Sequence, residues 1–436
     1  MAASLDRMTF ELRSAEVIAV GSELLGSTRL DTNSLFISRT LASLGILLKA
    51  KAVVGDDRAL LRDLFALAIT RSDLVVVTGG LGPTDDDLTR EAVTDALGIP
   101  MSEDEAITAG IRNRFARRGM VMPALNRKQA MVPEGATALN NPNGSAPGLF
   151  IIAGEKIALL LPGPPRELQP MLNALCQPDG LLGARAGLAR LHSVSIFTTG
   201  LSESHVEELT QPLYARWRDA PEPIETTVLA TPGQVELHLT LRSGDAVGAK
   251  ATLDDARGEL VKALGLFAFS TDGRQLPHVV GELLQARGLT LAAAESCTGG
   301  LLMARMTDVA GSSGYVRGGV VAYSNELKVQ LLGVDQATIE THGAVSEPTA
   351  AAMADGVHDR TQADVCVAIT GIAGPSGGTD AKPVGTVVIA TRVTGHPLSV
   401  RTHVFPGGRD MVRFQATQTA IEGVRRILLA ASAARP

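Results

Sequence analysis

The sequence predicts an α/β protein in which two doubly wound α/β domains are joined by a smaller α+β module. The chain has 436 residues, which is too long for one ordinary hydrophobic core. Near both ends of the chain, short β-rich runs alternate with amphipathic segments, as they do in parallel sheets with crossover helices. Between these regions, residues 188–270 contain runs that alternate with a period of two, which is typical of half-exposed strands.

The first α/β domain is predicted over residues 14–183. Its run DLVVVTGG is almost continuously apolar, as expected of a strand that is covered on both faces. The order of strands and helices before it favours a parallel sheet. The predicted elements are the strand 15–21, the helix 33–45, the strand 47–55, the helix 58–71, the strand 73–80 and the strand 156–165.

The middle module is predicted over residues 188–270, with strands in RLHSVSIFTTG and GQVELHLTLRSG and two helices. The second α/β domain is predicted over residues 274–432. There LTLAAAES, GGVVAYS and ADVCVAITG are predicted strands, and CTGGLLMARMTDV and NELKVQLLGV are predicted helices. The segment MVRFQATQTAIEGVRRILLAA is predicted to close the chain as a long helix.

The composition excludes several classes of protein. Net charge is −6 and no long Lys/Arg cluster is present, so a nucleic-acid surface is not expected. The three cysteines lie far apart without CxxC spacing, which argues against a disulfide framework and a zinc site. The sequence shows no signal-peptide core and no run long enough to span a bilayer. We expect a cytoplasmic enzyme or binding protein.

Ser296 stands where the predicted strand LTLAAAES ends and a helix is expected to begin. Reactive groups collect at such strand ends in open parallel sheets. The free N–H groups of the first helical turn would form an oxyanion hole, and Gly299 and Gly300 would let a ligand approach the backbone. The alternative is that Ser296 only caps the helix.

A serine nucleophile needs a base, and Lys328 is the candidate. It lies in or near the first turn of a helix that Ser324 would cap, just after Tyr323 closes a strand. The helix dipole and burial would both lower the pKa of the amine, as a general base requires. A solvated helix lysine and a core tyrosine are the alternatives. No histidine of this region stands convincingly at a strand end beside a carboxylate: His342, His358, His396 and His403.

Two further features of this domain suit an anion. The loop ITGIAGPSGG carries Gly371 and Gly374 and could wrap backbone N–H groups around a phosphate, although its spacing is not that of a P-loop. A plain turn is the alternative. Arg409 and Arg413 flank the start of the last helix, where either could hold an anion.

The segment VTGGLGPTDDDLTREAV in the first domain is predicted to be a strand, a glycine loop and a helix that opens with three aspartates. The glycines and the helix start suit a phosphate. Three carboxylates beside a phosphate require a hard cation between them. The alternative is that Thr84 and the aspartates only cap the helix.

Six motifs in order resemble the C-terminal domain of the CinA family, which is the nicotinamide-nucleotide amidase: AESCTGG, AGSSGYVRGGVVAYSNELK, HGAVSEP, ITGIAGPSGG, KPVGTV and GGRDMVRFQA. The resemblance covers nearly all of residues 276–432. It implies hydrolysis of nicotinamide mononucleotide to nicotinate mononucleotide and ammonia, without a metal or cofactor. It also implies that Ser296 is the nucleophile, Lys328 the base and Tyr323 an assisting group. The substrate-binding residues that it implies are Thr298, Gly299, Ser313, Gly371, Gly374, Arg409 and Arg413, with the choice between the two arginines open.

VGSELLGSTRLDTNS, NPNGSAPG and LPGPPRELQPM resemble the N-terminal domain of the same family, which is similar to the molybdopterin-binding fold of molybdenum-cofactor proteins. The resemblance implies a KH-like middle module and, in some members, hydrolysis of ADP-ribose with a divalent metal. The nucleotide-binding residues would be Gly79, Gly80, Gly82, Thr84, Asn143 and Ser145, and the metal ligands Asp85, Asp86 and Asp87.

Two alternatives stay open for the N-terminal domain. It could bind a pterin without pyrophosphatase activity, or the chain could be an interaction protein in competence or the response to DNA damage. We expect small-molecule nucleotides as ligands, no nucleic acid, no membrane, and a homodimer.

Overall fold

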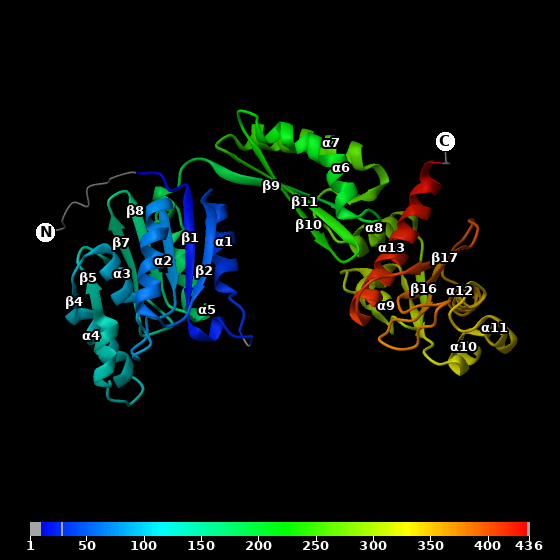
Figure 1. Cartoon of the computed structure of the whole chain (residues 1–436), viewed down its shortest axis with the longest axis horizontal. Helices are drawn as coiled ribbons and strands as arrows, with labels where there is room; N and C mark the ends of the chain where they lie inside the picture. The colour runs from blue at the N-terminus through cyan, green and yellow to red at the C-terminus, as the bar shows by residue number, and fades with distance from the viewer. Residues whose placement is uncertain (1–9, 28, 434–436) are drawn as a thin grey trace. The chain divides into compact units, whose positions relative to one another are not determined.

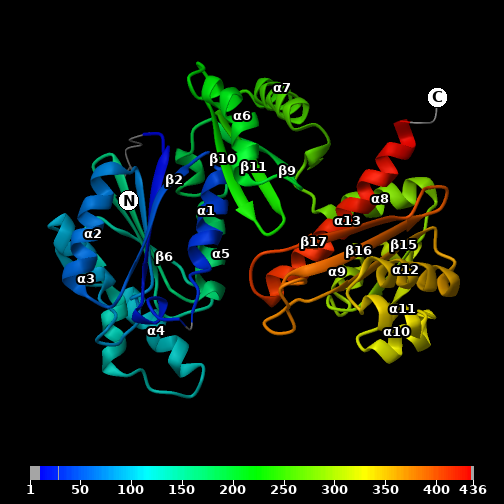
Figure 2. The ribbon, with the colours of Figure 1, turned by 45° about the vertical axis from the view of Figure 1, so that its right-hand side comes forward.

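The computed structural model describes residues 10–27 and 29–433, and the chain divides into two compact units (Figures 1 and 2). One unit runs to His192 and includes Arg242–Ala249, and the other comprises Ser193–Leu241 and the residues from Lys250 on. The predicted α/β class is confirmed, but both α/β sheets are mixed rather than wholly parallel. The boundaries 14–183, 188–270 and 274–432 remain predictions.

The first unit is built on a six-stranded sheet of order β2-β1-β3-β8-β7-β6. The four strands β2, β1, β3 and β8 run parallel, whereas β7 and β6 pair antiparallel. The sequence pattern did not reveal β6 or β7. The strands are β1 (Ser14–Val20), β2 (Leu47–Val54), β3 (Leu74–Thr78), β6 (Thr137–Leu139), β7 (Gly148–Ala153) and β8 (Lys156–Leu161).

Helices cover both faces of this sheet. Apolar side chains of α1 (Asn33–Ser43) and α5 (Pro165–Leu175) belong to one core cluster, and those of α2 (Arg58–Arg71) and α3 (Thr89–Leu97) belong to another. The two clusters take alternate residues of the same central strands, as a sheet buried on both faces requires. A smaller excursion contains β4 (Met101–Glu103), α4 (Glu105–Ala116) and β5 (Met131–Pro133).

The middle module is an antiparallel sheet of order β10-β11-β9-β12 with two helices. Buried and half-buried residues alternate along β11, as the period-two pattern predicts. The elements are β9 (Arg190–Thr198), α6 (Glu203–Arg218), β10 (Ile224–Thr231), β11 (Gln234–Ser243), α7 (Ala246–Leu264) and β12 (Ala268–Ser270).

The C-terminal sheet has the order β14-β13-β15-β16-β17. The first three strands in this order are parallel, and β16 and β17 are antiparallel to their neighbours. The strands are β13 (Leu291–Glu295), β14 (Val316–Val321), β15 (Val365–Gly371), β16 (Thr386–Val393) and β17 (Ser399–Val404).

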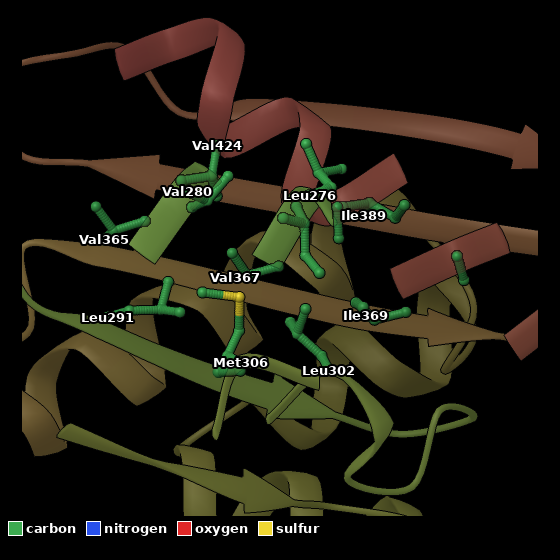
Figure 3. Close-up of a cluster of buried hydrophobic side chains, with 14 of the residues drawn as sticks. Leu276, Val280, Leu291, Leu302, Met306, Val365, Val367, Ile369, Ile389 and Val424 are labelled. Atoms are coloured by element: carbon green, nitrogen blue, oxygen red, sulfur yellow. The ribbon is translucent and has the colours of Figure 1, made fainter. Parts of the chain in front are cut away.

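Two hydrophobic clusters sandwich this second sheet. Figure 3 shows the first cluster, in which residues such as Leu276, Met306 and Val424 from three helices pack on β13, β15 and β16. These helices are α8 (Leu276–Arg287), α9 (Leu301–Thr307) and α13 (Arg409–Ala433). The second cluster covers the opposite face with α10 (Asn325–Leu332), α11 (Gln336–His342) and α12 (Glu347–Thr361).

Two helices begin later than the sequence predicts. Gly299 and Gly300 have φ of 59° and 92°, so the chain turns after Ser296 and α9 starts only at Leu301. Likewise α3 starts at Thr89, so Asp85, Asp86 and Asp87 do not open the helix but stand in the loop before it. No helix in the described part of the chain is long and apolar enough to cross a membrane.

Candidate active site

Ser296 directly follows β13 at the switch point of the C-terminal sheet. From β13 the chain continues to β14 on one side and later returns to β15 on the other. In open α/β sheets, ligands bind at the carboxyl ends of the strands at such a switch point. The Ser296 backbone N–H donates to the Ile369 carbonyl of β15 at 2.9 Å. Ser296 therefore stands at the sheet edge where ligands of such folds bind.

Lys328 lies directly beside this serine. Its Nζ is 3.1 Å from the Ser296 Oγ and 3.1 Å from the Ala322 carbonyl oxygen, and the Tyr323 carbonyl oxygen is 3.5 Å away. Only 2% of Lys328 is exposed, and burial lowers the pKa of its amine. A neutral amine has two hydrogens for the two carbonyls and one lone pair for the serine hydroxyl. The arrangement therefore suits a general base.

The position of Lys328 follows from the helix that carries it. The Ser324 side chain caps α10 by accepting from the Leu327 N–H at 3.3 Å, and this fixes the first turn. Because β14 is parallel to β13, the start of α10 lies at the same sheet edge as Ser296. Residues that are 32 positions apart in the sequence are thereby brought into contact.

Glu295 is a functional candidate that the sequence reasoning missed. Its carboxylate, 1% exposed, accepts the N–H groups of Gly300, Leu302 and Met303 at 3.0, 3.1 and 2.9 Å. These N–H groups at the start of α9 are therefore occupied by Glu295, and they do not form the predicted oxyanion hole. The detectable signal in the sequence is an acidic residue at a strand end, followed by a glycine pair before a helix.

The turn between Ser296 and α9 leaves two other donors available. Within the described residues, the backbone N–H groups of Cys297 and Thr298 donate to no protein acceptor. Gly299 closes the turn by donating its N–H to the Ser296 carbonyl at 3.0 Å. Because Cys297 and Thr298 directly follow Ser296, their N–H groups are candidate donors for an oxyanion formed there.

The two arginines have different partners. Arg413 donates to the Thr298 carbonyl at 2.8 Å and so supports the turn. Arg409 donates to the Gly374 carbonyl and to the Tyr323 hydroxyl, each at 2.9 Å. Because Tyr323 is 57% exposed, Arg409 and Tyr323 form a solvent-facing rim rather than part of the core.

For three other predicted substrate-binding residues, the structure does not indicate a side-chain contact with a substrate: Ser313, Gly371 and Thr298. Ser313 precedes β14, so it lies at the amino ends of the strands, the opposite sheet edge from Ser296. A Cβ on Gly371 would lie 2.7 Å from the Val387 Cγ2, which means that this glycine permits strand packing. The Thr298 hydroxyl is buried without a hydrogen-bond partner among the described residues.

Cys297 is adjacent to the serine, but its thiol is expected to be a poor nucleophile. The residue is buried, and burial raises the pKa of its thiol to about 11. A thiol is a poor nucleophile unless it is deprotonated. Cys297 is therefore suited to packing, and it belongs to the hydrophobic cluster beneath α9.

The first unit has a separate cavity of about 880 Å³ at the carboxyl ends of β1 and β3. This is the switch point of the N-terminal sheet, where ligands bind in such folds. The predicted residues that line it are Gly79, Gly80, Gly82, Ser145, Asp86 and Asp87. The predicted residues Thr84, Asp85 and Asn143 are not part of its lining.

The three aspartates do not converge on one point. The Asp87 carboxylate accepts from the Gly82 N–H at 2.7 Å and from the Thr84 N–H at 2.9 Å, so it closes the glycine loop. The Thr84 hydroxyl also donates to the Asp87 carboxylate, at 2.5 Å. In the described part of the chain, no group of three or more His, Cys, Asp or Glu side chains is arranged to hold a metal ion. The predicted metal triad does not fit this geometry.

Comparison with known proteins finds matches to both halves of the chain. Residues 273–428 match the CinA C-terminal domain, and residues 16–180 match the family described as "Probable molybdopterin binding domain". A CinA-like protein of Koribacter versatilis is 43% identical and covers 95% of this chain and 100% of its own length. A CinA-like protein of Acidobacterium capsulatum is 41% identical, with 95% and 100% covered. A crystal structure of a CinA superfamily protein from Klebsiella pneumoniae is 37% identical, covers 36% of this chain and 96% of its own, and has a TM-score of 0.35.

Proposed function

Because the chain belongs to the CinA family, we propose that its C-terminal domain hydrolyses nicotinamide mononucleotide to nicotinate mononucleotide and ammonia. The observation that carries this proposal is the contact between the buried Lys328 amine and the Ser296 hydroxyl, 3.1 Å apart. A serine with a depressed-pKa lysine beside it is equipped for acyl transfer. The amide of the nicotinamide group is the acyl donor in this reaction.

In the proposed first step, the Ser296 Oγ attacks the carboxamide carbon while its proton passes to the Lys328 Nζ. The carbonyl oxygen takes the negative charge and is held by the N–H groups of Cys297 and Thr298. When the tetrahedral intermediate collapses, the C–N bond breaks and the Lys328 proton leaves with ammonia. Water then gives a proton to Lys328 and attacks the acyl-enzyme. The bond between the acyl carbon and the Ser296 Oγ breaks, Lys328 returns its proton to this oxygen, and the acid that is released ionises to the carboxylate product.

The 5′-phosphate is assigned to the rim of the site. Arg409 is exposed and lies beside Gly374 in the glycine-rich loop, where a guanidinium and backbone N–H groups can share an anion. Arg413 is half-buried against the Thr298 carbonyl, so its role is to hold the turn. We therefore assign phosphate binding to Arg409.

A second candidate function belongs to the 880 Å³ cavity of the N-terminal unit. Its position at a switch point and the match to a molybdopterin-binding family favour a nucleotide or pterin ligand. If this cavity is catalytic, the reaction that we propose for it is the hydrolysis of ADP-ribose. The aspartate run does not supply a metal ligand set, so no catalytic step is derived for this cavity.

Three other assignments remain part of the proposal. The middle module, with two helices on an antiparallel sheet, is proposed to be KH-like. The chain is proposed to act in the cytoplasm and to form a homodimer. None of these is needed for the chemistry at Ser296.

The test of function is product analysis. The full-length chain would be incubated separately with nicotinamide mononucleotide and with ADP-ribose, each with and without a divalent metal, and the products identified by mass spectrometry. We expect nicotinate mononucleotide and ammonia without added metal. If nicotinamide mononucleotide is returned intact under all conditions, the amidase proposal is wrong. If ADP-ribose is returned intact under all conditions, the proposal that the N-terminal unit hydrolyses it is wrong.

A further inference from the structure

A cavity in the C-terminal unit has no role in the chemistry described above. Its volume is about 760 Å³, and it lies between the middle module and the C-terminal sheet. One wall is the loop 199–203 with the turn between β10 and β11, and the other is formed by β16, β17 and α13. Ser296, Lys328 and Tyr323 are not part of its lining. Cavities of this size at junctions between modules are typical of small-molecule sites.

The walls of this cavity carry two guanidinium groups that can hold an anion, those of Arg401 and Arg426. Arg401 pairs with Ile389 through the backbone of β17, but its guanidinium has no hydrogen bond or ion pair among the residues that the structure describes. Glu422 on α13 is buried, and its carboxylate accepts from the Nε atoms of Arg425 and Arg426, both at 2.7 Å. The charge of Glu422 is therefore already paired, whereas the guanidinium of Arg401 and the remaining N–H groups of Arg426 can bind a ligand. Glu203 is the other acid in the lining.

The same walls carry aromatic rings. The rings of His403 and Phe405 stack at 5.4 Å with an interplanar angle of 10°, and the Arg426 guanidinium lies over Phe267 at 5.0 Å. Burial is the main cause that lowers the pKa of His403, so near neutral pH this ring is an uncharged stacking surface. Aromatic rings next to guanidinium groups bind planar bases and phosphates together.

We propose that this cavity binds a mononucleotide, with its base against the rings of Phe267, His403 and Phe405 and its phosphate on Arg401 and Arg426. Backbone and side-chain polar groups of the module face the same space, among them Gln234 of β11. A ligand held by both walls would join the module to the C-terminal sheet. Gln234 already makes such a link, since its Oε1 accepts from the Gln418 Nε2 of α13 at 3.4 Å.

Photolabelling of the full-length chain tests this site. The probe is 8-azido-AMP, followed by peptide mapping, with excess AMP as competitor. We expect competable labels in segments 199–203, 230–235 or 399–405. Arg401→Glu should reduce this labelling by about tenfold or more, because a charged hydrogen bond is replaced by repulsion. Arg317→Glu, the same change on an exposed residue of β14, should leave it unaltered.

The outcomes separate this proposal from the amidase proposal. Arg401→Glu should retain its turnover of nicotinamide mononucleotide, and its circular dichroism should match the wild type. Three results would overturn the proposal: labels confined to the N-terminal cavity or to residues 296–300, labels at 399–405 that AMP does not displace, or equal labelling of a folded Arg401→Glu variant. His403→Ala, as a second variant, should also weaken the competable labelling, and an unchanged signal would count against the base-stacking surface.

Discussion

The buried amine of Lys328 has three oxygen neighbours, and only the Ser296 hydroxyl carries a proton that it can accept. Lys328→Arg keeps a positive charge and a similar reach, but arginine stays protonated and cannot act as a base. We expect this variant to lose on the order of a hundredfold or more in kcat, the usual scale for removal of a general base. Steady-state kinetics with nicotinamide mononucleotide would measure this.

Lys328→Met is the matched comparison, since it removes the charge and the base together. It should be impaired to a similar degree, with little change in nucleotide binding, because the phosphate is assigned to Arg409. A folded Lys328→Arg variant with nearly wild-type kcat would return Lys328 to a structural role.

Substitutions of the neighbouring residues Ser296 and Cys297 are expected to have opposite effects on ammonia release. Ser296→Ala should abolish ammonia release, whereas Cys297→Ala should keep most of it. Because burial raises the pKa of the Cys297 thiol to about 11, iodoacetamide at pH 7.5 should leave activity intact. A dead Cys297→Ala variant beside an active Ser296→Ala variant would mean that the nucleophile is misassigned.

At the scale of elements, the start of α9 depends on Glu295. Three backbone N–H groups share this buried carboxylate, and hydrogen bonds to charged groups contribute about 1.5–3 kcal/mol each. Glu295→Gln replaces one acceptor oxygen with a donor that would face those N–H groups. We expect the free energy of unfolding to fall by about 2 kcal/mol or more, as measured by urea titration.

The same substitution should also lower kcat more than it raises KM, because the turn that carries the Cys297 and Thr298 donors would lose its anchor. Glu340→Gln, on the exposed face of α11, is the control and should change neither quantity appreciably. If Glu295→Gln has wild-type kcat after correction for folded fraction, Glu295 is only a helix cap.

Much of this arrangement could be predicted from the sequence. The apolar strand before Ser296 and the capping Ser324 indicate where β13 ends and α10 begins. Since carboxyl ends of parallel strands share one sheet edge, Ser296 and Lys328 could be expected near each other. The same logic, applied to Ser313, would have placed it at the opposite edge, because it comes before β14.

Other features could not be read from local patterns. Ser296 followed by Cys and Thr resembles a helix start, but the left-handed turn at Gly299 and Gly300 delays α9, and the carboxylate of the preceding Glu295 folds back to cap it. Mixed strand direction was missed because a strand buried on both faces has the same apolar pattern in either direction. The short connection between β7 and β8 was the available signal, since parallel strands need a longer crossover.

At the scale of the whole molecule, the two candidate sites lie in separate units and should respond independently. Asp86 lines the N-terminal cavity and Asp85 does not, so the two aspartates form a matched pair. We expect Asp86→Asn to weaken any turnover of ADP-ribose and Asp85→Asn to change it little, and neither should alter amidase activity. Parallel assays of both substrates would show this, and a joint loss of the two activities would refute independence.

The central claim is that Lys328 is neutral in the resting enzyme and takes the proton of Ser296. Burial lowers the pKa of this amine, and only the unprotonated form accepts a proton. The pH dependence of kcat/KM for nicotinamide mononucleotide therefore tests the claim most directly. We predict that kcat/KM rises about tenfold per pH unit at low pH and levels off at a midpoint below about 10.4, the value of an unperturbed lysine. A profile without that rise, or one that Lys328→Met reproduces with the same midpoint, would contradict the claim.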